Sequence, residues 1–175
     1  MTRGSRRPIQ PTIRAHGADA NSASGAEDQF REALACWASG VAILAASDGE
    51  EIDALTISAF SALSADPPLV MVSVGEQTSI LPMLLEEQRF TVSILAADQR
   101  ATAGAIAQRL PGSEGVFDSL EDPAVKGALA VLTCSLWNAY EGGDHRIVVG
   151  RVEQISFGEA MDPLLYFRRE YRDLR

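Results

Sequence analysis

Hydroxyl side chains are the densest group of potential ligands in this sequence. They fall in two segments: Thr56, Ser58, Ser61 and Ser64 in the first, and Thr78 and Ser79, directly after Gln77, in the second. We expect a helix to begin at 77–79, where free amides and the positive end of the helix dipole would suit a phosphate without any lysine. The alternative is that Thr78 and Ser79 only cap that helix, and local chemistry alone favours it. Ser58 and Ser61 could likewise be ordinary solvent-facing strand residues.

Several common catalytic motifs are absent from the sequence. It contains no Gly-x-Gly-x-x-Gly segment, no P-loop and no Gly-x-Ser-x-Gly. Of its two histidines, His16 lies in the N-terminal segment, which leaves His145 alone with carboxylates as a poor ligand set for common metals. We therefore expect neither a metal site nor a catalytic triad.

The hydrophobic pattern predicts the elements that position these groups. Apolar and polar residues alternate over 54–60, which indicates a strand with its hydroxyl residues on the face away from the core. The other expected elements are strands at 41–46, 69–74 and 90–95, helices at 27–39, 77–87 and 98–110, a loop at 111–122, and a long hairpin at 129–140 and 146–156. Strands at hairpin spacing with a few isolated helices predict an antiparallel β-barrel, α+β in composition.

Length and composition describe one globular domain: 175 residues, 46% hydrophobic, with a net charge of −9. No apolar run approaches the ~20 residues that span a bilayer, and an acidic surface disfavours nucleic acid. Cys36 and Cys134 lie among apolar residues, so we expect reduced core cysteines in a cytoplasmic protein. Residues 1–26 carry a net charge of +3 and no apolar period, which predicts a disordered tail before a domain at 27–175.

Five segments of the chain also follow one another in a recognisable order. They are residues 40–44, 55–70, 90–95, 143–152 and 163–168. The first hydroxyl segment reads Thr-x-Ser-Ala-Phe and continues into Ser-x-Asp-Pro-Pro-Leu-Val, while Gly-Asp-His precedes a strand that ends in Gly-Arg-Val. On these motifs the chain, from about Phe30 to Leu174, resembles the short-chain flavin reductases of the FMN-binding split-barrel superfamily.

The resemblance implies a fold, an activity and partners. The fold would be mainly β (α+β), a six-stranded antiparallel Greek-key split β-barrel with flanking helices. The activity would be NAD(P)H-dependent reduction of FMN or FAD, with NADH or NADPH as hydride donor. The partners would be a second copy in a homodimer and a separate flavin-dependent monooxygenase that receives the reduced flavin.

The resemblance also implies roles for particular residues. Thr56 and Ser58 would bind the ribityl or phosphate region, the main chain of 62–64 the isoalloxazine edge, and 77–79 the phosphate. His145 would be the catalytic residue, over the flavin face where the nicotinamide stacks, and Arg168 and Tyr171 would flank the same opening. The full set of implied cofactor ligands is Leu55, Thr56, Ser58, Ala59, Ala62, Leu63, Ser64, Gln77, Thr78, Ser79, Arg168 and Tyr171.

Hydride transfer fits the missing acid and base motifs, because it mainly requires the nicotinamide carbon and flavin N5 to stack at ~3 to 3.5 Å. Two other interpretations stay open. One is a non-enzymatic split-barrel protein that holds flavin or another cofactor such as haem or F420, since fold does not fix function. The other is a purely structural dimer whose hydroxyl-rich strand is plain surface.

Overall fold

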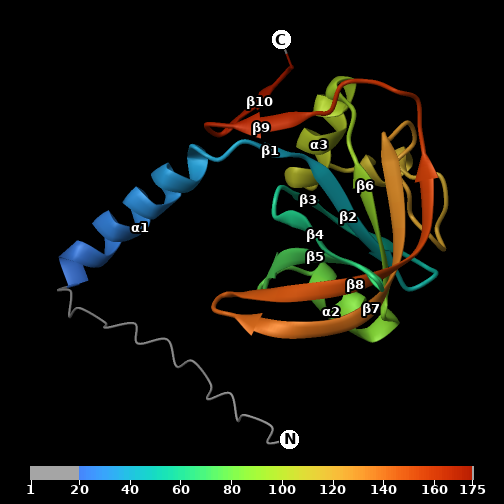
Figure 1. Ribbon diagram of the computed structural model, residues 1–175, viewed down its shortest axis with the longest axis horizontal. Helices are drawn as coiled ribbons and strands as arrows, with labels where there is room; N and C mark the ends of the chain where they lie inside the picture. The colour runs from blue at the N-terminus through green and yellow to red at the C-terminus, as the bar shows by residue number, and fades with distance from the viewer. Residues whose placement is uncertain (1–19, 175) are drawn as a thin grey trace, which may run out of the picture. The chain divides into compact units, whose positions relative to one another are not determined.

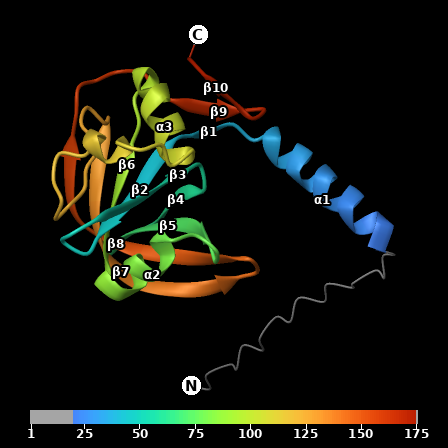
Figure 2. The ribbon, with the colours of Figure 1, turned by 180° about the vertical axis from the view of Figure 1, so that it is seen from behind.

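The computed structural model describes residues 20–174, which form two units (Figure 1, Figure 2). The first is a single helix, α1 (Ala20–Ala35), and the second runs from Cys36 onward. The helix begins before the predicted start at Glu27 and includes residues 20–26. It also ends before Ser39, so Trp37 lies outside it. Residues 1–19 of the predicted tail lie outside the described residues.

The second unit consists mainly of β-strands, and every strand pair in it is antiparallel. The strands are β1 (Ser39–Gly40), β2 (Ala42–Ser47), β3 (Ile52–Ile57), β4 (Phe60–Ala65), β5 (Pro68–Gly75), β6 (Arg89–Ile94), β7 (Ala130–Gly142), β8 (His145–Phe157), β9 (Leu165–Phe167) and β10 (Glu170–Arg172). The helices are α2 (Ile80–Glu87) and α3 (Arg100–Ala107), with the 3₁₀ turns η1 (Ala97–Gln99) and η2 (Ser113–Val116). No helix of residues 20–174 is long and apolar enough to span a membrane.

The large sheet closes into a split barrel. Its strand order is β3-β2-β6-β7-β8-β5-β4, so the two edge strands, β3 and β4, are consecutive in the chain. The chain leaves one edge after Ile57 and enters the other at Phe60, without hydrogen-bonded pairing between them (Figure 1). The predicted barrel is thereby confirmed, with one difference in count. The expected strand 54–60 ends at Ile57, and the chain continues as β4, which makes seven strands in this sheet.

Successive side chains of β2 point alternately into two different hydrophobic cores. Leu44 faces the barrel interior, where the buried valines of β5 and β8 pack with Phe90 and the apolar face of α2. Ile43 faces the opposite side, where α3, the 116–128 segment and Leu164 pack. The two helices therefore pack on opposite faces of the β2–β3 pair.

Two smaller expectations need correction. The helix expected over 98–110 is divided into η1 and α3, because the Gln99 side chain accepts the Ala96 amide at 2.9 Å and caps the turn before α3. Of the two cysteines only Cys134 is a core residue, and its burial raises the pKa of the thiol to about 12. Cys36 is exposed, because it follows the end of α1 rather than lying within a packed element.

Candidate functional site

Two predicted flavin ligands, Thr56 and Ser58, line a cavity of about 220 Å³. The cavity is completed by Val41, Ile57, Ala107, Tyr166 and Tyr171. The Thr56 hydroxyl donates to the carbonyl of Ala103 in α3 at 2.8 Å, so toward a ligand it can only accept. The rings of Tyr166 and Tyr171 meet edge to face with centroids 5.6 Å apart. Burial, with Tyr166 beside it, raises the pKa of the Tyr171 hydroxyl, which is therefore a neutral hydrogen-bond donor.

Strand β4 offers a free main-chain edge. Among the strands of residues 20–174 it pairs only with β5, and the register shifts between Ala62 and Ser64, which leaves Leu63 at a bulge. The main-chain groups of a bulged residue fall outside the ladder, so the predicted main-chain contacts of 62–64 have groups available. The carbonyl of Ala59, in contrast, accepts an amide of β5 at 3.1 Å. Leu55 packs against the barrel core, so any flavin contact from it would come from its main chain.

The N-terminus of α2 carries free amides. Ser79 precedes the helix, but its hydroxyl donates to the Asp53 carboxylate and does not cap the helix. The Thr78 hydroxyl donates to the carbonyl of Gly75 at 2.7 Å. Side-chain capping of α2 by either residue is thus absent in the described chain. Within residues 20–174, the amides of Ser79 and Ile80 donate to no protein acceptor, so both are available to an anion.

His145 lies beside the same segment. It begins β8 directly opposite Gly75, the last residue of β5. A methyl group built on Gly75 would meet Thr78 Cγ2 at 3.5 Å and His145 Nε2 at 3.8 Å, which places the imidazole edge next to Thr78. The other ring nitrogen, Nδ1, lies 2.7 Å from Asp144 Oδ1, and this contact lowers the pKa of the Asp144 carboxyl. The structure therefore brings His145 together with 77–79.

An ion pair fixes the hairpin that carries His145. Arg146 Nε donates to Glu76 Oε1 at 2.6 Å, and both side chains are about two-thirds buried. The Glu76 amide also donates to the Asp144 carbonyl at 3.0 Å. These contacts join the β7–β8 turn to the β5–α2 connection, so the position of His145 is set from both sides.

The two C-terminal candidates differ in their surroundings. Tyr171 lines the cavity described above, whereas Arg168 sits in the β9–β10 turn with its guanidinium over the Phe167 ring, 5.3 Å from the centroid. Arg168 and Arg169 both adopt left-handed backbone conformations, with φ of 51° and 63°. In the described chain no hydrogen bond or ion pair joins Arg168 or Tyr171 to His145, so their grouping around one opening stays a prediction.

Sequence reasoning missed three residues next to these groups. Tyr166 lines the cavity with Tyr171. The two tyrosines are separated by a segment that contains two arginines, and this pattern could have indicated a short hairpin that pairs them. Asp53 contacts Ser79, and Arg109 contacts Asp53. No sequence pattern indicates these two contacts, because they join residues far apart in the chain.

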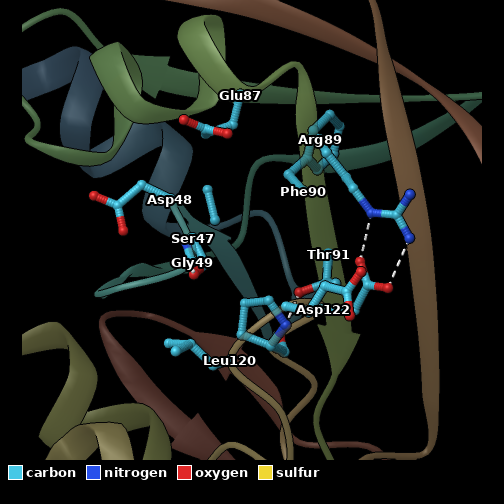
Figure 3. A pocket seen from close by; sticks show the side chains of 12 residues that line it. Ser47, Asp48, Gly49, Glu87, Arg89, Phe90, Thr91, Leu120 and Asp122 are labelled. Atoms are coloured by element: carbon cyan, nitrogen blue, oxygen red, sulfur yellow. Dashed lines mark hydrogen bonds and ion pairs between the residues drawn. The ribbon is translucent and has the colours of Figure 1, made fainter.

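A second cavity, of about 330 Å³, lies between the β2–β3 turn, the end of α2 and the 120–123 loop (Figure 3). None of the predicted site residues lines it. Arg89 makes a two-pronged ion pair with Asp122 at 2.6 Å, which holds the pKa of that carboxyl below its usual value. Asp48, Glu87 and Glu121 add further acidic groups. An anionic ligand such as a flavin phosphate is disfavoured there.

The split barrel agrees with comparisons to known proteins. The family described as flavin reductase like domain matches residues 34–175. The reductase component of 4-hydroxyphenylacetate 3-monooxygenase from Thermus thermophilus is 49% identical over 85% of this chain and 97% of its own length. An NADH-dependent flavin reductase from a Rhodococcus species is 34% identical over 83% of this chain and 85% of its own. The solved structure of flavin reductase PheA2 superposes with a TM-score of 0.80 at 32% identity, covering 85% of this chain and 98% of that one.

The fold and the comparisons thus define a split-barrel protein of the flavin-reducing class. The chain belongs to the flavin reductase like domain family. The fold class and the family predicted from sequence are confirmed. The individual roles of the site residues stay predictions.

Proposed function

We propose that this protein transfers hydride from NADH to FMN or FAD and supplies the reduced flavin to a separate monooxygenase. The observation that carries the proposal is the combination, on one barrel, of the Thr56–Ser58 cavity, the free edge of β4 and the uncapped N-terminus of α2. The activities named for the relatives support the same function. The enzyme class and the flavin expected from the sequence agree with it, and the sequence left the donor open between NADH and NADPH.

The described groups fit the parts of a flavin. Ring carbonyls and nitrogens would find main-chain partners at 62–64, hydroxyls of the ribityl chain would meet Thr56 and Ser58, and a phosphate would accept from the amides of Ser79 and Ile80. When bound, a flavin supplies the ring that accepts hydride. The protein binds and orients this ring and excludes water from it.

His145 is the residue we propose for orienting the nicotinamide. Its ring is half-exposed, and its Nδ1 is held by Asp144 at 2.7 Å. A fixed, partly exposed imidazole beside the proposed phosphate seat can stack on or donate to a second ligand without reorganising. Hydride transfer needs such positioning more than it needs an acid or base.

A homodimer is the assembly we propose. Met71, Ile147, Val149 and Tyr140 occupy one face of the β5–β8–β7 part of the sheet, because Met71 pairs with Val149, and Ile147 pairs with Tyr140, in register. This is the face opposite the barrel core; Met71 and Tyr140 are exposed on it, whereas Val149 is already buried within the chain. Covering apolar strands with a second copy would remove them from water. Sedimentation velocity should give a dimer mass for the wild type and a shift toward monomer for Met71→Lys; a monomeric wild type would contradict the proposal.

Steady-state NADH oxidation tests the proposed activity. We expect oxidation of NADH only when FMN, FAD or riboflavin is added, and slower oxidation of NADPH with the same flavin. The ratio of rates among the flavins would identify the preferred one. Flavin binding without NADH or NADPH oxidation would contradict the reductase proposal and favour a protein that only holds its cofactor.

A further inference from the structure

Asp53 places a fixed carboxylate beside the proposed phosphate seat. Its side chain is only 18% exposed. One carboxylate oxygen accepts the Ser79 hydroxyl, and the other accepts the Ala54 amide at 2.8 Å. The carboxylate is therefore held in place by donors from both β3 and the residue that precedes α2. Its negative charge opposes a phosphate at the amides of Ser79 and Ile80.

Arg109 supplies the opposite charge at the same place. Its Nη2 lies 3.8 Å from Asp53 Oδ1, a distance that indicates an ion pair without close hydrogen bonding. Its side chain is half-exposed and comes from the residues just after α3. A loosely paired guanidinium can turn toward a phosphate at little cost, because the contact that it gives up is long and partly solvated.

We infer that Asp53 and Arg109 set how strongly the protein holds the flavin phosphate: Asp53 weakens the hold and Arg109 strengthens it. This inference rests on the proposed function, in which 77–79 binds that phosphate. The Ser79 hydroxyl donates to the Asp53 carboxylate, so it is not available to the phosphate. The phosphate would also lie near a second negative charge, that of Asp53. Together, Asp53 and Arg109 would keep the phosphate of a flavin bound weakly enough for the flavin to dissociate. A protein that supplies reduced flavin to another enzyme requires such dissociation.

Equilibrium binding of FMN and riboflavin separates this effect from general changes in the site. The two flavins differ by the phosphate alone, so the ratio of their dissociation constants reports on the phosphate contact. Asp53→Asn should raise the preference for FMN on the order of tenfold, because it removes a mostly buried like charge. Arg109→Gln should lower that preference several-fold. Glu51→Gln, an exposed residue of the preceding turn, removes the same charge and should leave the ratio unchanged.

The outcomes distinguish the inference from the function on which it rests. Equal affinity of the wild-type protein for FMN and riboflavin would contradict the phosphate seat itself. A wild-type preference for FMN that stays the same in Asp53→Asn, or that changes equally in Glu51→Gln, would overturn the role of Asp53. Thermal unfolding of each variant without flavin checks that the barrel is intact: the oxygen of Asn at position 53 can still accept the Ala54 amide, and its NH2 group can donate to the Ser79 hydroxyl.

Discussion

Gly150→Ala is expected to lower the free energy of unfolding by about 3 kcal/mol, the upper end of the usual cost of overpacking a core. Gly150 lies in β8, where a Cβ would fall well inside van der Waals contact with the Phe90 ring and at 3.0 Å from Cys134 Cβ. Phe90 is fully buried among the barrel valines, so its ring cannot move aside without opening the core. Denaturant titration of the variant and the wild type measures the difference.

The matched control is Gly115→Ala, where a Cβ has no neighbour within 4 Å and the backbone conformation is an ordinary one. We expect this control to stay within about 0.5 kcal/mol of the wild type, as exposed substitutions usually do. Adding Phe90→Leu to Gly150→Ala should recover part of the loss, because the clash with the ring is removed. Equal stability of Gly150→Ala and Gly115→Ala would show that the packing described around β8 is wrong.

His145→Ala is expected to lower kcat/KM for NADH on the order of tenfold or more, while the affinity for flavin stays nearly unchanged. Loss of a positioning group misplaces the reacting atoms, and small displacements have large effects on rate. The proposed flavin contacts come from the cavity, from β4 and from the amides of Ser79 and Ile80, and none of these groups belongs to the imidazole, although it lies beside the last of them. NADH oxidation at saturating flavin, together with a separate flavin titration, gives both quantities.

Asp144→Asn is the control for His145→Ala. An amide oxygen can still hold the imidazole through its Nδ1–H, so we expect a smaller decrease in kcat/KM than for His145→Ala. A His145→Ala variant with wild-type kcat/KM would exclude His145 from the nicotinamide site. A parallel loss of flavin affinity would instead assign it to the flavin.

Most of the barrel was predictable because its signals are local. The apolar run 69–74 between Pro68 and Gly75 predicts β5, and the turn residues 141–144 between two long segments predict the β7–β8 hairpin, whose turn in the structure is shortened to Gly143 and Asp144. The break between β3 and β4 was not predictable from alternation. It arises where the sheet closes on itself, which depends on strands distant in the chain.

The candidate site was predictable in its residue types and only partly in its contacts. The hydroxyls of Thr56 and Ser58 do line one cavity, and His145 does lie beside Thr78. Tertiary packing determines the acceptor to which each hydroxyl donates: Thr56 donates to α3 and Ser79 donates to Asp53. Those partners lie 47 and 26 residues away in the chain, so no local pattern indicates them.

Anaerobic mixing of the protein, excess flavin and NADH, followed by filtration that retains the protein, tests whether this protein both reduces flavin and releases it. We expect one reduced flavin to form per NADH consumed, with the reduced flavin in the protein-free filtrate. Reduced flavin that stays with the protein would contradict its role as a supplier to a separate monooxygenase. Unconsumed NADH, despite bound flavin, would contradict the reductase activity itself.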